Sequence, residues 1–459
     1  MRQFPLHTGL TIALVAVLLA AVRLVAPAIQ GPRPAQLAAM VDFEPEHVPL
    51  SPLSRHEEPM PAPPPTPVGI RIPAARVLFD DAGGVLDPFY KALWAAEKHE
   101  AGAVVRIVHY GDSPTTADLI TGDIRALLQQ RFGDAGHGFV LVAKPWAWYQ
   151  HDGVGLSGSG CKILPASHYE AHDGMFGLGG VSFTGGSSAR SRITFRAPGQ
   201  SRFEVWFLNQ PGGGALSVKA DGRTLGRINT SGASKTPGFV TFEVETPARE
   251  LELEVEQGTV RVFGIAAGKP GPGVVYDSLG LNGASITVLS RMFDQTHWGA
   301  QLAHRAPHLV TVNYGTNEAD FAAFVERQYE KELREAIRRI RAALPDAAIL
   351  IMSPMDRGRR NRAGEIETMA TIPQIVDIQR RVARETGCGF FDTFDAMGGS
   401  GTMARWYAAQ PRLVSADFIH PYPAGGRMIA VTFTREIGRG LNRYKLRQVV
   451  QEPSAPATR

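Results

Sequence analysis

Three polar residues far apart in the chain have the side-chain types needed to activate a serine. Ser113 ends the sequence Gly111-Asp112-Ser113 and follows the apolar run 104–110, while Asp417 and His420 stand close together near the C-terminus. An imidazole accepts a proton from a serine hydroxyl near neutral pH. A carboxylate on the other ring nitrogen fixes the tautomer and stabilises the imidazolium. The set therefore predicts a nucleophile, a general base and an orienting acid.

Each of these residues also has an ordinary structural explanation. Serine is a good helix N-cap, so Ser113 on its own favours a cap. The Asp-x-x-His spacing carries no information by itself, because it occurs at Asp134/His137, Asp294/His297 and Asp417/His420. Only the last pair lies between the final predicted strand and the final predicted helix, and this position selects it.

A carbonyl oxygen that gains negative charge during acyl transfer needs preorganised hydrogen-bond donors. The backbone N–H groups of Ser113 and Gly283 and the side-chain amide of Asn317 can supply three. Glycine lets the backbone approach closely, and the asparagine amide donates without carrying charge. Gly283 can equally be a plain turn glycine and Asn317 a capping residue.

The elements that must position these residues alternate between strand and helix. Strands are predicted at 104–110, 307–314, 347–352 and 389–394, and helices at 87–100, 117–130, 322–343, 375–386 and 425–441. Within the helix 322–343, Glu330–Arg334 and Glu335–Arg339 have the i,i+4 spacing of ion pairs. The alternation predicts an α/β fold with a doubly wound, mostly parallel sheet and helices on both faces. Active sites of such sheets form where strands end and helices begin, which is where the candidate residues lie.

Residues 145–272 interrupt this alternation with a glycine-rich composition. Short alternating runs, separated by turn signals, predict strands at 191–195, 203–207, 216–218, 251–255 and 260–263. Several short strands joined by turns predict a β-sandwich. The chain is therefore expected to hold one α/β domain, 74–144 and 273–447, with an inserted β domain at 145–272.

The N-terminus carries an export feature. Residues 8–22 are nearly all apolar, Arg23 follows, and Ala26-Pro27-Ala28 resembles a cleavage site. Residues 1–30 therefore predict a signal peptide or an uncleaved anchor; the anchor is favoured because a cleavage site beyond Arg23 is unusual. Either one places the rest of the protein outside the cytoplasm, in the periplasm or another extracytoplasmic space. A proline-rich linker at 31–73 and a disordered tail at 448–459 are also expected.

Composition excludes several function classes. The chain has 459 residues, is 44% hydrophobic and carries a net charge of only +4. We find no interleaved basic and aromatic track, so no nucleic-acid partner is expected. Cys161 and Cys388 can pair in an exported protein or remain free thiols, and neither has a second cysteine nearby for a zinc site.

The ordered series Gly-Asp-Ser, Gly, Gly-x-Asn and Asp-x-x-His resembles the SGNH (GDSL-type) hydrolase superfamily. Within it, the chain is similar to bacterial peptidoglycan O-acetylesterases with a carbohydrate-binding-module-like β domain. Further matching residues are Phe89-Tyr90, His109-Tyr110, Phe132-Gly133, Gly136, Gly138, Tyr276-Asp277, Leu279-Gly280, Asn282-Gly283-Ala284 and Tyr314-Gly315-Thr316-Asn317-Glu318. The likeness covers residues 80–445. Glu318, where many members have Asp, and Pro114-Thr115 depart from the pattern, which leaves fine substrate preference open.

The resemblance implies a two-step acyl transfer that needs no metal or cofactor. It implies Ser113 as nucleophile, His420 and Asp417 as its partners, and Ser113, Gly283 and Asn317 as oxyanion donors. The expected activity is removal of O-acetyl groups from a glycan, with peptidoglycan favoured. An O-acetyltransferase and a non-catalytic glycan-binding protein remain alternatives. A lipase is disfavoured because no apolar lid-like segment lies near Ser113.

Two groups of side chains are candidates for substrate contact. Arg357, Arg359, Arg360 and Arg362 crowd a loop at the expected active-site edge and can bind carboxylates of an acidic glycan or stem peptide, or form a solvated loop. Trp146, Trp148 and Tyr149 stand at the junction with the β insert. They can stack on sugar rings, with Trp148 as the candidate, although packing between domains is favoured.

Overall fold

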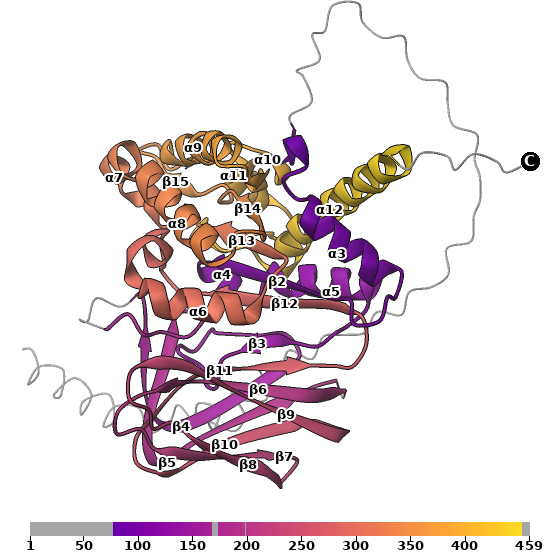
Figure 1. The fold of residues 1–459 in the computed structure, drawn as a ribbon. Coiled ribbons are helices and arrows are strands. Elements are labelled where there is room, and N and C mark those ends of the chain that lie inside the picture. The colour runs from indigo at the N-terminus through magenta and orange to yellow at the C-terminus, as the bar shows by residue number, and fades with distance from the viewer. Residues whose placement is uncertain (1–76, 168–172, 198, 452–459) are drawn as a thin grey trace, which may run out of the picture. The chain divides into compact units, whose positions relative to one another are not determined.

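The computed structural model describes residues 77–167, 173–197 and 199–451, all within one compact unit of the chain (Figure 1). The predicted signal or anchor at 1–30 and the linker at 31–73 lie outside these residues. No helix in the described part is both long and apolar enough to span a bilayer. The final helix, α12 (Pro423–Gln451), extends past residue 448, where the tail was predicted to begin.

A six-stranded sheet forms the centre of the α/β part (Figure 1). Its spatial order is β1 (Phe79–Asp80), β17 (Gly389–Phe391), β14 (Ala348–Met352), β13 (Leu309–Asn313), β2 (Val104–Gly111) and β12 (Gly273–Gly280). Five strands are parallel, and only β1 runs antiparallel to its neighbour. The prediction of a mostly parallel sheet is thus confirmed. The winding direction reverses between β2 and β13, and ligands bind at such reversals in doubly wound sheets.

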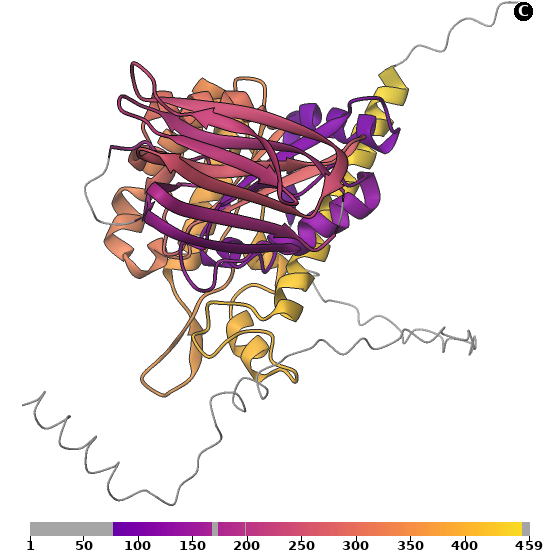
Figure 2. The same ribbon diagram turned by 90° about the horizontal axis from the view of Figure 1, so that it is seen from below.

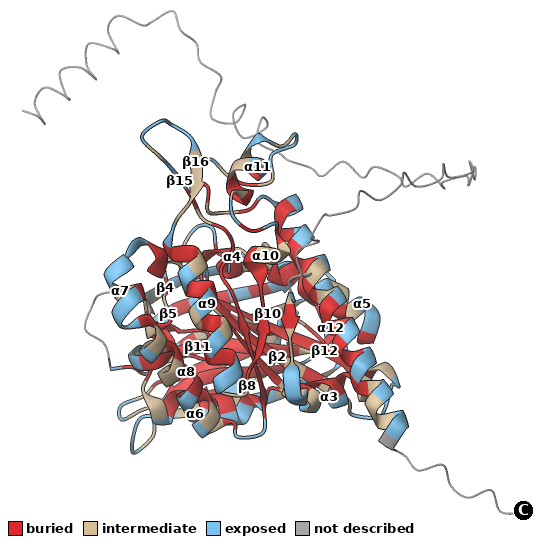
Figure 3. Ribbon diagram, turned by 90° about the horizontal axis from the view of Figure 1, so that it is seen from above, coloured by how far each residue is buried: buried red, intermediate tan, exposed pale blue. Residues whose placement is uncertain are grey.

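Helices cover both faces of this sheet because successive side chains of each strand point to opposite sides. Val105 and Ile107 of β2 join one core with α3 (Asp87–Glu97), α5 (Thr121–Phe132) and α12. Val108 and Tyr110 join the other with α6 (Gln295–Arg305), α8 (Tyr329–Ala343) and α9 (Thr371–Glu385). Figure 3 shows the buried strands between the two helical layers.

One predicted helix begins late and another is broken. The helix predicted at 117–130 begins only at Thr121, as α5, and is separate from the one-turn helix α4 (Ser113–Thr116), because Asp118 adopts a left-handed φ of 55° that no α-helix continues through. Its carboxylate forms a buried ion pair with Arg125 at 2.6 Å, which fixes this turn. The region 322–343 divides at Gln328, where φ is −131°, into α7 (Ala322–Arg327) and α8.

One of the two predicted helix-surface ion pairs is wrong. Glu330 pairs with Arg334 at 2.7 Å as predicted, but Glu335 pairs with Arg338 at the same distance. Arg339 points inward and donates to the carbonyl of Leu289 at 2.6 Å. Buried carbonyl groups therefore bind the Arg339 guanidinium, which the i,i+4 spacing from Glu335 had placed on the helix surface.

Nine strands between residues 138 and 268, after α5 and before β12, form an antiparallel sheet (Figure 2). Its strands are β3 (Gly138–Val140), β4 (Val154–Pro165), β5 (Val181–Phe195), β6 (Gln200–Asn209), β7 (Ala215–Ala220), β8 (Arg223–Asn229), β9 (Thr236–Ala248), β10 (Glu250–Gln257) and β11 (Val260–Gly268). The long strand β5 pairs with β11 through its first half and with β10 through its second. Strand β3 lies before the predicted boundary at 145, yet it pairs with β11. That this segment is a separate carbohydrate-binding domain stays a prediction.

The two sheets share one core. Phe139 of β3 and Trp206 of β6 belong to the same apolar cluster as Tyr110 of β2. A buried ion pair at 2.6 Å joins Asp277 of β12 to Arg305, and Asp277 also accepts the backbone N–H of Phe139 at 2.7 Å. The β segment is therefore fastened directly against the strand that precedes Gly283.

Short elements complete the edge of the six-stranded sheet at which its parallel strands end. A hairpin of β15 (Gly358–Arg360) and β16 (Ile366–Thr368) projects beside α11 (Thr402–Ala408), as Figure 3 shows. The remaining elements are η1 (Ala82–Gly84), η2 (Val288–Met292), η3 (Glu318–Asp320) and α10 (Thr393–Ala396).

Candidate active site

Ser113 stands where β2 ends and is the first residue of the one-turn helix α4. Asp112 is the N-cap, and the N–H of Thr116 closes the turn on its carbonyl at 2.9 Å. The side chain of Ser113 makes no capping bond, so the capping alternative is wrong. The helix behind the serine is one turn and not the long helix expected, so its dipole adds little.

The structure brings Ser113, His420 and Asp417 together by two hydrogen bonds. Ser113 Oγ lies 2.7 Å from His420 Nε2, and His420 Nδ1 lies 2.6 Å from Asp417 Oδ2. With the proton on Nδ1, Nε2 is free to accept from the serine hydroxyl. Serine and histidine are 307 positions apart in the sequence and meet because both follow strands that end at the same edge of the sheet.

The carboxylate of Asp417 is held as an anion. Burial alone would raise its pKa, but hydrogen bonds from the side chains of His420 and Ser415 and from two backbone N–H groups lower it to about 2. The backbone donors are Ile419 at 2.9 Å and His420 at 3.1 Å. At neutral pH the carboxylate is therefore charged, as an imidazolium partner requires.

The loop that carries Asp417 and His420, the histidine loop, contacts the hairpin β15–β16. Phe418 has a left-handed φ of 58°, and its carbonyl accepts the N–H of Gly358 at 3.0 Å. Its ring packs edge-on against Tyr407, with centroids 5.0 Å apart. The guanidinium of Arg360 lies 5.1 Å from the centre of the same ring. The hairpin thus supports the residue between Asp417 and His420.

The loops that carry Gly283 and Asn317 are joined directly. Asn317 Nδ2 donates to the carbonyl of Ala284 at 2.8 Å, which fixes the amide plane and leaves its second N–H for another acceptor. Asn317 does occupy the N-cap position of η3, but its side chain makes no capping bond there. Gly283 has φ 67° with open space around its missing Cβ, so its left-handed turn, and not close packing, favours glycine.

Comparisons with known proteins bear on the family of this fold. The GDSL-like Lipase/Acylhydrolase family matches residues 258–428, a range that contains Gly283, Asn317, Asp417 and His420. A solved peptidoglycan O-acetylesterase is 25% identical and covers 80% of this chain and 100% of its own, with a TM-score of 0.69. Residues 258–428 therefore carry a GDSL-like lipase/acylhydrolase domain, and the similarity to the solved esterase is consistent with an SGNH hydrolase. None of the curated proteins matches it.

Two family-two carbohydrate esterases are also similar to the hydrolase, at much lower structural agreement. The Clostridium thermocellum esterase is 13% identical, covers 61% of this chain and 99% of its own, and has a TM-score of 0.29. The Cellvibrio japonicus esterase is 11% identical, with 63% and 98% covered and a TM-score of 0.28.

Two buried carboxyl groups of the hydrolase were not predicted as site residues. Glu318 accepts the N–H groups of Ile286 at 2.8 Å and Gly315 at 3.1 Å. Burial raises its pKa to about 7, and the charge of Asp112 adds to this, while its backbone donors lower it. Burial also raises the pKa of Asp112 to about 6. An acidic residue directly after Asn317, at the end of a buried strand, was the available signal for Glu318.

The other two Asp-x-x-His pairs of the hydrolase serve the fold. Asp294 caps α6 by accepting the N–H of His297 at 2.8 Å, and the His297 ring contacts the carbonyl of Phe176 at 2.9 Å. Asp134 forms an ion pair with Lys269 at 2.6 Å. Neither pair bonds to Ser113, in agreement with the choice made from chain position.

Three arginines proposed for substrate contact have partners inside the hydrolase. Arg357 donates to Asp320 at 2.7 Å and to the carbonyl of Thr316 at 2.5 Å, beside Asn317. Arg359 pairs with Glu367 at 3.0 Å, and Arg360 donates to the carbonyl of Gly364 at 2.7 Å. These bonds favour a structural role for the loop, and contact with substrate stays a prediction.

The aromatic cluster before β4 divides into packing and exposed residues. Tyr149 is buried, and Trp146 is partly buried against the core. Trp148 is exposed, and its Nε1 donates to Asn282 Oδ1 at 3.2 Å. Because Asn282 precedes Gly283, this indole lies at the edge of the candidate oxyanion site.

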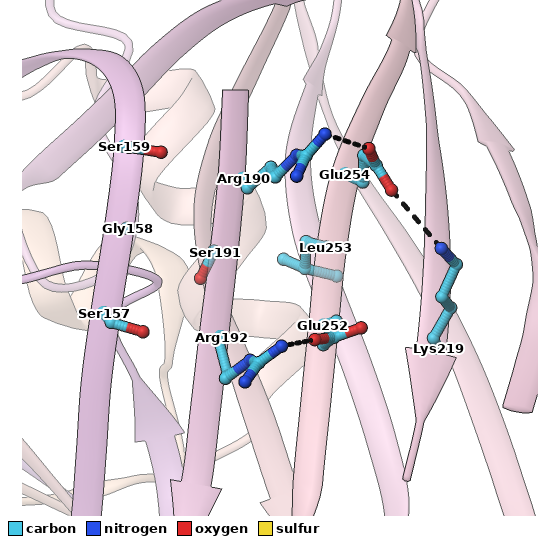
Figure 4. Close-up of a pocket in the computed structure, with 10 residues that line it drawn as sticks. All are labelled: Ser157, Gly158, Ser159, Arg190, Ser191, Arg192, Lys219, Glu252, Leu253 and Glu254. Atoms are coloured by element: carbon cyan, nitrogen blue, oxygen red, sulfur yellow. Dashed lines mark hydrogen bonds and ion pairs between the residues drawn. The ribbon is translucent and has the colours of Figure 1, made fainter. Parts of the chain in front are cut away.

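A charged groove lies on the nine-stranded sheet (Figure 4), with a volume of about 510 Å³. Arg190 and Lys219 pair with Glu254 at 3.1 Å and 3.3 Å, and Arg192 pairs with Glu252. None of the candidate catalytic residues lines it. The described residues contain no cluster of three metal-ligating side chains, and Cys161 and Cys388 are not disulfide-bonded.

Proposed function

We propose that this hydrolase is a serine esterase that removes O-acetyl groups from carbohydrate, with peptidoglycan as the favoured substrate. The hydrogen-bonded chain from Ser113 through His420 to Asp417 carries the proposal. The similarity to a peptidoglycan O-acetylesterase over 80% of the chain supports the choice of an acetylated glycan.

The chemistry follows from the positions of these side chains. His420 Nε2 takes the hydroxyl proton as Ser113 Oγ bonds to the acetyl carbonyl carbon, and the carbonyl electron pair moves to oxygen. Collapse breaks the ester C–O bond, and the imidazolium returns the proton to the departing sugar oxygen. Water then attacks the acetyl-serine with the same base, which releases acetate and restores Ser113. The anionic Asp417 stabilises the imidazolium in both steps.

The oxyanion in this scheme is stabilised by three neutral donors. These are the N–H groups of Ser113 and Gly283 and the free N–H of Asn317, whose other hydrogen bonds to Ala284. Donors that are already fixed need no reorganisation as charge develops. The bond between Asn317 and Ala284 supplies that fixing.

The N-terminal sequence is the basis for a proposal about where in the cell the enzyme works. We infer that the enzyme works outside the cytoplasm, held to the membrane through 1–30 and spaced from it by 31–73, or exported after cleavage. Protease treatment of intact and permeabilised cells tests this: the catalytic part should be cut before the cytoplasmic markers are. Protection until the inner membrane is broken would contradict it.

Incubation with acetylated and chemically deacetylated peptidoglycan tests the activity. Acetate should be released from the acetylated polymer alone, and muropeptide analysis should show lost O-acetyl groups without cleavage of the glycan. Acetyl transfer to an added glycan without free acetate would instead identify a transferase. Binding without either reaction would identify a glycan-binding protein.

A further inference from the structure

Few aromatic side chains are exposed in the part of the chain that the structure describes. Among the described residues, only Trp148 (51% exposed), Phe321 (64%) and Tyr422 (43%) are aromatic residues in the exposed class. The other large exposed hydrophobic residues are aliphatic: Val77, and Met428, Val431, Leu446, Val449 and Val450 of α12. Exposed aromatic rings are therefore rare in the described residues. Single exposed apolar side chains are common on proteins, but a group of them at one place indicates a binding surface.

Each of the three rings stands beside a different candidate catalytic loop. Trp148 donates to Asn282, the neighbour of Gly283. Phe321 follows η3, four positions after Asn317. Tyr422 comes two positions after His420 and directly precedes α12. Because His420 bonds to Ser113 and the loops of Gly283 and Asn317 are joined to each other, the three aromatic residues lie on the loops that carry the candidate site; we call them the aromatic rim.

Hydrogen bonds fix the backbones of Phe321 and Tyr422 in the aromatic rim. The N–H of Phe321 bonds to the carbonyl of Glu318 at 2.9 Å, and its own carbonyl accepts from Phe324 at 2.9 Å. The N–H of Tyr422 bonds to the carbonyl of Leu413 at 2.9 Å. Rings presented by an ordered backbone lose little conformational entropy when they bind a ligand.

We propose that Trp148, Phe321 and Tyr422 form subsites that hold sugar rings of an extended glycan around the scissile acetyl group. The inference rests on the proposed function and adds to it a preference for polymer over small esters. Aromatic faces pack against the apolar C–H faces of sugar rings. Each aromatic side chain therefore adds contact area to a site that otherwise binds only the acetyl group.

The surroundings of the rim favour a glycan over an acyl chain. Polar groups stand beside two of the three residues: Asn282 bonds to Trp148, and Asp320 precedes Phe321 and pairs with Arg357. A long acyl chain needs a continuous apolar surface, whereas sugars need separate rings between hydrogen-bonding groups. The groove on the nine-stranded sheet offers paired charges and no aromatic ring (Figure 4).

Single alanine variants of the three rings and the triple variant test the subsites. The kcat/KM for acetylated peptidoglycan should fall relative to that for 4-nitrophenyl acetate by roughly 2–12-fold for each ring removed, from the usual strength of aromatic contacts. The loss should appear mainly in KM for the polymer. Leu446→Ala is the matched control, because Leu446 is 66% exposed at the far end of α12. It should leave the ratio unchanged.

Two outcomes would overturn the subsites. One is a triple variant whose polymer-to-small-ester ratio equals that of the wild type, and the other is an equal loss with Leu446→Ala. Co-sedimentation of Ser113→Ala with insoluble peptidoglycan, with and without the triple change, measures binding independently of turnover. If the wild type releases no acetate while sedimentation still depends on the rim, the esterase proposal is rejected and the subsites are kept. Sedimentation that does not depend on the rings would reject the subsites alone.

Discussion

The carboxyl group of Glu318 accepts the backbone N–H of Ile286 at 2.8 Å, across 32 positions of sequence. Its second oxygen accepts the N–H of Gly315 at 3.1 Å. Ile286 follows Gly283 by three positions, and Gly315 precedes Asn317 by two. One buried carboxyl group therefore ties together the two loops that carry the candidate oxyanion donors.

Glu318→Gln should lower kcat more than it raises KM. Glutamine keeps one acceptor oxygen but turns the other into an NH₂ group, so one loop N–H loses its partner. A buried unpaired N–H lowers kcat here by an expected roughly 5–150-fold, if the whole cost falls on the transition state. In an Asn317→Ala background the same change should cost far less, because both act through one oxyanion site. Steady-state kinetics of the double-mutant cycle, which compares the wild type, the two single variants and the double variant, measures this coupling.

Asp392→Asn is the matched control for that cycle. Asp392 is also a buried carboxyl group that accepts a backbone N–H, from Asp395 at 2.9 Å, but it follows β17 and touches neither oxyanion loop. Its effect on kcat should be small and additive with Asn317→Ala. Additive losses for Glu318→Gln would show that Glu318 serves only the fold.

The proton of Glu318 should also make stability depend on pH. Its pKa is raised to about 7, chiefly by burial, and the titratable groups near it are Asp112, Tyr314 and Tyr329. The unfolded glutamate has a pKa of about 4.3, so the folded protein binds the proton more tightly. This stabilisation is complete below about pH 4.3 and is lost as pH rises through 7.

Wild type should therefore lose stability relative to Glu318→Gln as pH rises from about 4.5 to about 7.5. The expected loss in the free energy of unfolding is roughly 1–3 kcal/mol. Urea denaturation at a series of pH values measures it. Parallel pH profiles for the two proteins would mean that Glu318 is already ionised at low pH.

Ser113→Ala should abolish nearly all hydrolysis of an acetyl ester while the protein stays folded. Among the described residues the hydroxyl bonds only to His420, and Ser113 makes no capping bond, so little structure depends on it. Acetate release and thermal unfolding, measured on the same preparation, separate loss of chemistry from loss of fold. Wild-type turnover in this variant would reject the assigned nucleophile.

Asn317→Ala should reduce kcat by roughly 10²–10³, the usual cost of one oxyanion donor. The change also removes the bond to Ala284, so the Gly283 loop loses one of its ties to the loop of Asn317. Asn317→Asp, which keeps the size but cannot donate when ionised, should be at least as damaging. Activity of the aspartate variant close to wild type would exclude the amide as a donor.

The candidate triad could be predicted from sequence because parallel strands place their ends at one edge. Ser113 follows β2, and His420 follows the last strand and precedes α12, so chain order alone put them together. The three-residue spacing of Asp417 and His420 did not identify the pair by itself, because it occurs twice elsewhere in the chain; the order of strands and helices selected it.

Features decided by contacts distant in sequence could not be predicted. The break at Asp118 depends on its buried pairing with Arg125, and the inward turn of Arg339 depends on carbonyl groups near Leu289. Strands β4, β8 and β9 lack a clean apolar alternation, because much of their surface is exposed. The role of Glu318 needs the partner Ile286, which no local pattern around Asn317 reveals.

The contact between the hairpin and the histidine loop leads to a final prediction. A Cβ added at Gly358 would lie 2.9 Å from Phe418 Cβ, 3.0 Å from Ile366 Cγ2 and 3.1 Å from Met403 Cβ. The tightest of these contacts should displace Phe418, the residue between Asp417 and His420. Gly358→Ala should then lower kcat, because small misplacement of a catalytic group is costly, while KM changes less.

Gly299→Ala is its control, since a Cβ there meets Ala343 Cβ at an ordinary 3.5 Å inside α6. It should leave kcat unchanged and raise stability by about 1 kcal/mol, because alanine favours a helix interior over glycine. Steady-state assays with 4-nitrophenyl acetate measure kcat and KM of the two variants, and unfolding curves measure their stability. If Gly358→Ala keeps the wild-type kcat, the hairpin does not position His420, and Phe418 is held by the bond between Ser415 and His420 and by the start of α12.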